Sequence, residues 1–147
     1  MATRPIIALD TNVIVALWNG DEVTSDFLSD VLDEANARGL LVIAPAVYAE
    51  LLANPRHDAA LAAAFLGDTN IRVDWQIDEE LWHAAGLAYR EYGARRRSQR
   101  GDPGPRRILT DFIIGAHASR RASELMTFDE HIYRQAFPSL KIVTPQP

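Results

Sequence analysis

The segment from Ile6 to Val13 constrains the fold of this chain more than any other. Four apolar residues, Ile6 to Leu9, lead directly into Asp10, which is followed by a hydroxyl and an amide side chain. A short apolar run of this kind is typical of a buried strand in a parallel sheet that has helices on both faces. Asp10 then lies at the carboxyl edge of the sheet, where open α/β folds place their functional sites.

The rest of the chain alternates between apolar runs and helical patterns. Further strands are predicted at residues 40–43, 71–75, 125–126 and 140–143. Helices are predicted at 13–18, 21–38, 46–53, 57–66, from Asp78 to just before Arg95, at 108–121 and at 130–137. Alternation of strands and helices implies a mainly parallel sheet covered on both faces. We therefore predict an α/β fold with three layers, α/β/α, and a four- to five-stranded sheet.

Composition excludes several classes of protein. A length of 147 residues suits a single domain spanning 1–147, and 48% hydrophobic residues fits an ordinary globular protein. The chain has no cysteine, which excludes disulfides and thiolate chemistry. Its longest apolar stretch, residues 40–49, is too short to cross a bilayer, and its N-terminus does not resemble a signal peptide. We therefore expect a cytoplasmic protein.

Basic residues are unevenly distributed, although the net charge is -5. Lys141 is the only lysine, so nearly all the positive charge is carried by arginine. One short segment, rich in proline and glycine, contains six arginines: Arg95, Arg96, Arg97, Arg100, Arg106 and Arg107. Guanidinium groups suit two-point contacts to phosphate or carboxylate. We interpret this segment as a loop that contacts either phosphate groups or a protein partner.

Four acidic side chains lie next to apolar structure at points that can converge. Asp10 follows the first strand, and Asp129 follows the fourth. Glu50 lies in the helix after the second strand, and Asp111 lies near the start of an apolar helix. In a right-handed parallel sheet, strand ends and helix starts lie on one edge.

Convergence of these carboxylates requires compensation of their charge. Two carboxylates about 5 Å apart repel by roughly 3 kcal/mol at an effective dielectric constant of about 20. Either some of them are protonated or a divalent cation holds them, and oxygen ligands favour Mg²⁺ or Mn²⁺. A metal ion held in this way lowers the pKa of a bound water and neutralises charge on a phosphoryl group. Metal-assisted phosphodiester hydrolysis is the reaction that this pattern favours.

Each acid also has a structural interpretation. Asp10 and Asp129 are suitable helix caps, and Asp111 is an acid in a first helical turn, where the helix dipole favours it. Glu50 is the hardest to explain structurally, because it borders an apolar helix face and needs a partner. The occurrence of all four in α/β order favours a common site.

Four sequence pieces carry a resemblance to a known family. They are ALDTN at 8–12, VYAEL at 47–51, LTDFIIGAHA at 109–118 and MTFD at 126–129. In order and spacing the chain resembles PIN-domain ribonucleases, and among them the VapC-type toxins of bacterial toxin–antitoxin pairs. The resemblance implies a PIN-like nuclease domain that cleaves RNA internally with Mg²⁺ or Mn²⁺.

The resemblance also implies roles for particular residues. The acidic, metal-binding quartet would be Asp10, Glu50, Asp111 and Asp129. Asn12 and Thr127 would be polar supports that orient carboxylates or water. The implied partners are an RNA substrate, a cognate antitoxin and a second copy of the chain in a homodimer.

Two features depart from the family pattern. His117 stands where many relatives have a small hydroxyl residue, and it lies six positions after Asp111, on a different side of the helix. We interpret His117 as structural. The arginine segment before Asp111 is longer and more basic than usual, so its assignment to RNA or to antitoxin stays open.

Other classes of protein remain as alternatives. Haloacid-dehalogenase-type phosphatases have a similar opening motif, but they need a second aspartate at the position of Asn12 and a lysine before the last acidic motif. A non-catalytic receiver module needs an acidic pair after the first strand, and Asp74 and Lys141 are poor substitutes for its other residues. A PIN domain that only binds is a third alternative, and the intact set of four acids argues against it.

Overall fold

The computed structural model describes residues 4–147. Within them, five strands form one sheet in the order β3-β2-β1-β4-β5. The strands are β1 (Ile6–Leu9), β2 (Leu40–Ile43), β3 (Arg72–Val73), β4 (Glu124–Met126) and β5 (Ile142–Val143). Every pair of neighbouring strands is parallel. The prediction of a mainly parallel sheet with four to five strands is confirmed, although β3 is shorter than predicted.

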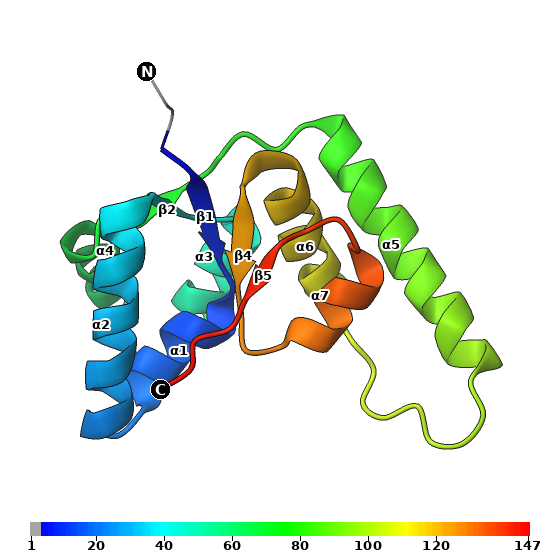
Figure 1. Cartoon of the computed structure of the whole chain (residues 1–147), viewed down its shortest axis with the longest axis horizontal. Coiled ribbons are helices and arrows are strands. Elements are labelled where there is room, and N and C mark those ends of the chain that lie inside the picture. Colours follow the sequence, from blue (N-terminus) through cyan, green and yellow to red (C-terminus); the bar gives the residue numbers. More distant parts are fainter. Residues whose placement is uncertain (1–3) are drawn as a thin grey trace.

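Seven helices connect these strands within the same described range. They are α1 (Thr11–Asn19), α2 (Glu22–Arg38), α3 (Pro45–Leu52), α4 (Ala59–Asp68), α5 (Glu79–Ser98), α6 (Leu109–Arg121) and α7 (Glu130–Ala136). In Figure 1, α1, α2 and α4 lie on one side of the strands, and α5, α6 and α7 lie on the other. The long helix α5 is outermost and packs along α6. None of the helices in residues 4–147 is long and apolar enough to cross a membrane.

Local sequence signals explain where several helices begin. The side chains of Asp21, Asp58 and Asp78 each accept a hydrogen bond from a backbone N–H three residues further on. Such caps satisfy donors that have no partner within the helix itself. Pro45 begins α3, at a position where the missing N–H costs nothing. The helices therefore start close to the points that the sequence predicts.

The central strand β1 and its neighbour β4 end side by side, which brings the polar residues that follow these two strands together. Ile7, Ala8 and Leu9 are buried, and Leu9 pairs with Met126 of β4. The backbone N–H of Asp10 donates to the carbonyl of Met126 at 3.0 Å, which continues the pairing one residue past β1. The residues that follow β1 and β4 therefore leave the sheet side by side.

The structure corrects the predicted end of α5. The sequence analysis placed Arg95, Arg96 and Arg97 in a loop, but α5 continues to Ser98. Basic residues in a last helical turn are stabilised by the negative end of the helix dipole, and the first glycine of this segment comes later, at position 101. The connecting loop therefore covers residues 99–108 and extends beyond the end of α5 in Figure 1.

Candidate active site

Asp10 is the most deeply buried of the four predicted acids. Only 6% of its surface is exposed. It precedes the first residue of α1, but its side chain makes no capping hydrogen bond, so the cap interpretation is wrong. Burial raises the pKa of the Asp10 carboxyl to about 6, although a hydrogen bond from Thr127 opposes the rise. The folded chain therefore stabilises the ionised form of Asp10 less well than water does.

Thr127 connects several residues of the site. Its buried hydroxyl donates to Oδ2 of Asp10 at 2.8 Å and accepts from the backbone N–H of Asp129 at 2.9 Å. The side-chain amide of Asn12 donates to the same hydroxyl at 3.3 Å, and Oδ1 of Asn12 accepts from the backbone N–H of Phe128, also at 3.3 Å. Asn12 and Thr127 thus restrain the two strand ends that carry Asp10 and Asp129.

Glu50 reaches the same edge of the sheet from α3. It is half-buried, and the hydroxyl of Thr11 donates to its Oε1 at 2.6 Å. Thr11 directly follows Asp10, so this hydrogen bond joins α3 to the start of α1. The sequence analysis gave Thr11 no role, yet it is the partner that a glutamate beside an apolar stripe was expected to need.

Asp111 and Asp129 are contributed by α6 and by the segment before α7. Asp111 is half-buried in the first turn of α6, and Asp129 precedes α7 without capping it through its side chain. The guanidinium of Arg107 pairs with both carboxylate oxygens of Asp129: Nη2 donates to Oδ1 at 2.8 Å, and Nη1 contacts Oδ2. Arg107 therefore has a partner within the chain that the sequence analysis did not predict.

The acids also influence the ionisation of one another. Burial raises the pKa of Asp111, and Arg107 lowers it in part. The negative charges of Asp129 and Glu50 raise it further. The charge of Asp111 in turn contributes to the raised pKa of Asp10. Because such coupling weakens with distance, the four carboxyl groups share one neighbourhood at the carboxyl edge of the sheet.

The four carboxylates nevertheless do not form a closed metal cage. In residues 4–147, no group of three or more histidine, aspartate or glutamate side chains is arranged to hold a metal ion. Three of the four acids have other partners, since Thr127 contacts Asp10, Thr11 contacts Glu50 and Arg107 contacts Asp129. The donors are all carboxylate oxygens, which suit Mg²⁺ or Mn²⁺. Their chemistry fits a divalent cation, although the side chains are spread apart.

Tyr133 is a residue of this site that the sequence analysis missed. It is buried in α7, and its hydroxyl faces the carboxyl group of Asp10, whose pKa it helps to lower. Burial raises the pKa of the phenol, and the nearby charge of Asp10 raises it further, so Tyr133 stays protonated. It follows Asp129 by four residues, a spacing that places two side chains on one helix face. That spacing is the signal that identifies it.

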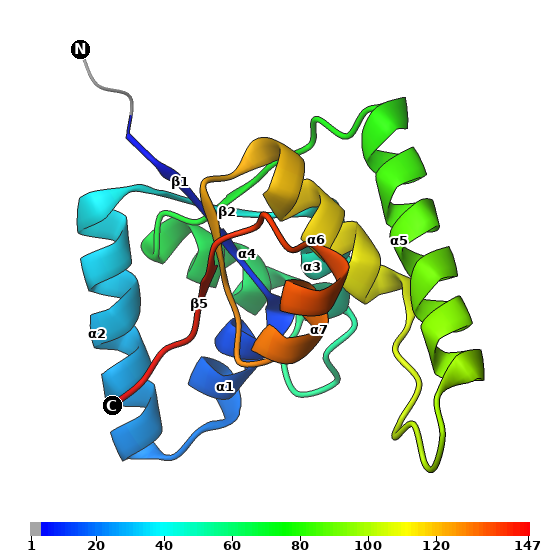
Figure 2. The same ribbon diagram turned by 45° about the vertical axis from the view of Figure 1, so that its right-hand side comes forward.

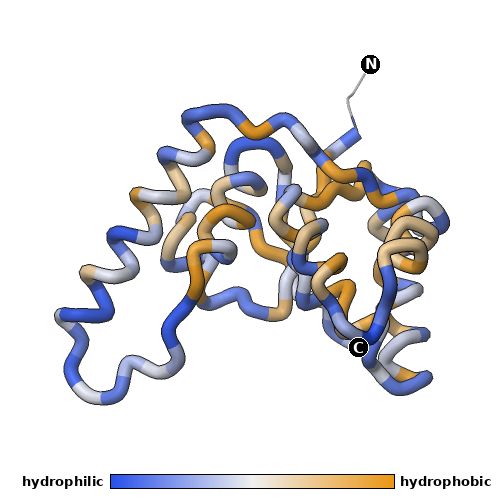
Figure 3. Tube along the Cα trace, turned by 180° about the vertical axis from the view of Figure 1, so that it is seen from behind, coloured by the Kyte–Doolittle hydropathy of each residue, from blue (hydrophilic) through white to orange (hydrophobic). Residues whose placement is uncertain are grey.

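The six arginines of the predicted contact segment fall into two groups, those that line a cavity and those that do not. A cavity of about 440 Å³ between α5, the loop 99–108 and α7 is lined by three of them: Arg95, Arg96 and Arg107. Arg97 and Arg106 do not line it, and the Arg106 guanidinium lies 6.0 Å from the ring centre of Tyr89. Arg100 is exposed in the loop. Figure 3 shows that the end of α5 and this loop are mostly hydrophilic.

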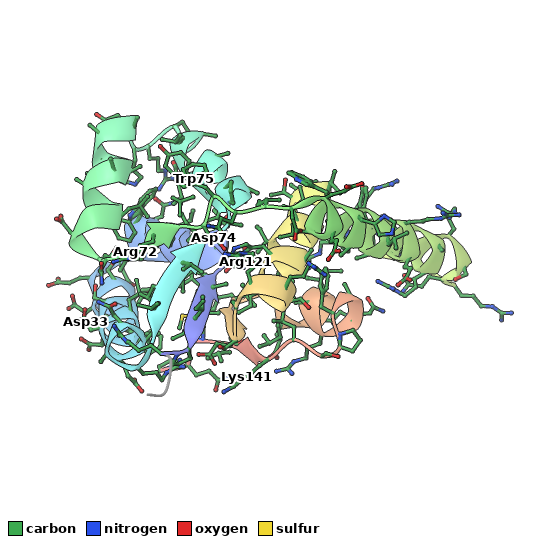
Figure 4. The ribbon with its side chains drawn as sticks, turned by 90° about the horizontal axis from the view of Figure 1, so that it is seen from above. Asp33, Arg72, Asp74, Trp75, Arg121 and Lys141 are labelled. Atoms are coloured by element: carbon green, nitrogen blue, oxygen red, sulfur yellow. The ribbon has the colours of Figure 1, made fainter. Side chains whose placement is uncertain are left out.

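His117 lies outside the acidic site, as predicted. It is buried on α6, and its Nε2 lies 3.1 Å from Oδ2 of Asp74, the residue after β3. Arg121 donates from Nε to the same oxygen at 2.6 Å, and Figure 4 shows Asp74 and Arg121 adjacent at the end of β3. Burial lowers the pKa of His117, although Asp74 opposes this. This cluster fastens α6 to the segment that leads from β3 to α5.

Comparison with known proteins identifies the family. The PIN domain family matches the chain over residues 7–138. Because this match covers nearly the whole sequence, the protein belongs to the PIN domain family. The prediction of a PIN-like fold is thereby confirmed. A search of curated proteins gives no significant match.

Solved structures with a similar fold include three assemblies named VapBC. VapBC2 from Rickettsia felis, bound to a DNA fragment from its promoter, matches with a TM-score of 0.64 and 20% identity over 96% of this chain and 99% of the other. VapBC-1 from nontypeable Haemophilus influenzae matches with a TM-score of 0.63 and 20% identity over 95% of this chain and 97% of the other. DNA-bound VapBC from Salmonella typhimurium matches with a TM-score of 0.63 and 19% identity over 99% of this chain and 100% of the other. At these identities the similarity establishes the fold alone.

Proposed function

We propose that this PIN domain is a metal-dependent endoribonuclease, with residues 1–147 forming one nuclease domain. The observation that carries the proposal is the buried carboxyl of Asp10 at the carboxyl edge of the sheet, with three further acids near enough for their charges to act on one another. A buried carboxylate with a raised pKa requires either a proton or a nearby cation. Membership of the PIN domain family supports the nuclease class.

The proposed metal-binding residues are Asp10, Glu50, Asp111 and Asp129. A Mg²⁺ or Mn²⁺ ion bound by these carboxylates supplies a water of lowered pKa and stabilises negative charge on the phosphoryl group. Thr127 and Asn12 act as positioning residues, because their hydrogen bonds fix Asp10 and the backbone before α7. Arg107 has to release Asp129 before that carboxylate can take part.

The similar structures also support a biological assignment. We propose that the protein is the toxin of a toxin–antitoxin pair, held by a cognate antitoxin and assembled as a homodimer. The VapBC assemblies that share its fold support this role. The phosphatase and receiver alternatives lose their support, because both the family match and the fold are those of PIN domains.

The test of the proposed function is a cleavage assay with a controlled supply of metal. Purified protein is incubated with single-stranded RNA in Mg²⁺, in Mn²⁺ or in EDTA, with DNA of the same sequence as the control substrate. We expect internal cleavage of RNA with either metal, its loss in EDTA and its recovery when Mg²⁺ is added in excess. Cleavage that continues unchanged in EDTA rejects the metal-dependent mechanism.

A further inference from the structure

We propose that the cavity lined by Arg95, Arg96 and Arg107 binds a phosphate group of the RNA strand beside the acidic site. The proposal rests on the ribonuclease function proposed above and specifies where the substrate backbone is held. The cavity has a volume of about 440 Å³. Figure 2 shows the elements around it, with α7 near the middle of the view and the loop 99–108 and the end of α5 to its right.

Arg95 supplies the donors that the chain itself leaves without acceptors. Its Nε and Nη2 atoms are buried, and neither has a hydrogen-bond partner within residues 4–147. A guanidinium group stays charged and carries only donors. Burying such donors without acceptors is unfavourable, and most buried polar atoms in proteins have partners. Because Arg95 lines the cavity, a change of its side-chain rotamer would let an acceptor that enters from outside satisfy these donors.

Arg96 holds the wall of the cavity. Its guanidinium donates to the backbone carbonyl of Gly104 at 2.7 Å and to that of Pro103 at 3.4 Å. The hydroxyl of Tyr92 accepts from the backbone N–H of Arg107 at 2.7 Å. These contacts join the middle of the loop and its C-terminal end to α5. The shape of the cavity is therefore formed before any ligand arrives.

Arg107 connects the cavity to the acidic site. It lines the cavity, and its guanidinium pairs with Asp129. A phosphate group in the cavity is thus separated from the carboxylates by a single arginine side chain. A strand whose backbone reaches the acidic site can therefore extend into this cavity, which suits it to hold a phosphate that flanks the one attacked.

The charge of the lining favours an anion with several oxygen atoms. The lining residues in the described chain include three arginines and His131 but neither aspartate nor glutamate. Ser98, Gln99 and Gln135 add neutral polar groups. Arginine binds phosphate through paired N–H groups, and neutral donors complete the contacts to the remaining oxygens. The position beside the acidic site favours RNA over an acidic peptide as the source of the anion.

The test is equilibrium binding of a short fluorescein-labelled oligoadenylate over a range of salt concentrations, in EDTA so that cleavage does not interfere. Arg95→Gln is compared with the wild type and with Arg97→Gln, a matched control that removes a neighbouring charge outside the cavity. We expect Arg95→Gln to weaken binding about tenfold and to reduce the slope of log affinity against log salt by about 0.7, the value for one phosphate contact on a single strand. Arg97→Gln should leave the slope within about 0.2 of the wild type.

A second variant keeps the proposal testable if Arg95→Gln does not fold. Gln135 is exposed on α7 and lines the cavity, so Gln135→Glu is expected to fold normally. It introduces a carboxylate that pairs with Arg95 and repels phosphate. We expect weaker oligoadenylate binding than in the wild type at low salt, with an unchanged melting temperature.

The outcomes separate this inference from the proposed function. Equal losses of affinity and slope in Arg95→Gln and Arg97→Gln overturn the phosphate subsite, even if the wild type cleaves RNA. Unchanged RNA binding combined with loss of polyglutamate binding in Arg95→Gln assigns the cavity to an acidic protein partner and also overturns it. RNA binding that depends on Arg95 supports the subsite even if metal-dependent cleavage is absent, a result that would count against the nuclease alone.

Discussion

Arg107 and Asp129 form a two-point ion pair inside the candidate active site. The pair joins the loop before α6 to the start of α7, and both side chains are partly exposed. One of the four proposed metal-binding carboxylates thus has a cationic partner within the chain itself. A divalent cation that binds Asp129, as proposed, would therefore compete with Arg107.

Removal of Arg107 should strengthen metal binding. In Arg107→Ala, Asp129 is available without loss of an ion pair, so we expect the affinity for Mn²⁺ to rise about threefold to tenfold, a range that suits a partly exposed pair. Isothermal titration calorimetry measures this directly. Arg106→Ala is the matched control, because Arg106 is the neighbouring arginine and lies over Tyr89. Equal or weaker Mn²⁺ binding in Arg107→Ala than in Arg106→Ala would show that Asp129 is not a ligand.

Neutralising Asp10 should stabilise the metal-free protein. The pKa of Asp10 is raised from 3.8 to about 6, so the folded state holds its proton more tightly than the unfolded state does. This contribution to stability is complete below about pH 4 and is lost as the pH rises through about 6. We therefore expect Asp10→Asn to raise the free energy of unfolding in EDTA at pH 7 by about 1–3 kcal/mol. If urea unfolding shows that Asp10→Asn is less stable than the wild type at pH 7, the claim that ionised Asp10 destabilises the folded protein is contradicted.

The fold and the edge of the sheet at which the four acids lie could be predicted because both depend on local sequence. The apolar run before Asp10 predicts a buried strand, and the parallel order of strands then fixes which edge the acid occupies. Parallel register makes Thr127 the neighbour of Asp10, and the two are hydrogen-bonded at 2.8 Å. Local patterns therefore sufficed to predict the edge of the sheet at which the acids lie.

The rest of the site depends on the path of the chain, which local patterns do not contain. Arg107 meets Asp129 across 22 positions because the end of the loop before α6 lies beside the segment that leads into α7. The extension of α5 to Ser98 cannot be predicted from charge density, because a basic segment suits a loop and a last helical turn equally well. Tyr133 was missed because a tyrosine among apolar residues usually belongs to the core.

The His117 cluster should make the protein sensitive to acid. Burial lowers the pKa of His117 below its ordinary value of 6.5, so the stability from neutral His117 is present above about pH 6.5 and is lost as the pH falls through the lowered pKa. We expect His117→Gln, whose amide can still donate to Asp74, to lose less melting temperature than the wild type between pH 7 and pH 5. The contribution of Asp10 has the opposite sign and is common to both proteins, so it cancels in the difference. An identical loss of melting temperature in His117→Gln and in the wild type would show that His117 does not cause the sensitivity to acid.

The most direct test of the central claim is the rate of RNA cleavage by Asp10→Asn at saturating Mg²⁺. Its control is Asp74→Asn, which changes another aspartate that directly follows a strand but lies in the His117 cluster. We expect Asp10→Asn to cleave roughly 100-fold more slowly than the wild type or worse, because it loses a central carboxylate of the metal site. Asp74→Asn should stay within about threefold of the wild-type rate. Cleavage by Asp10→Asn at the wild-type rate would contradict the account.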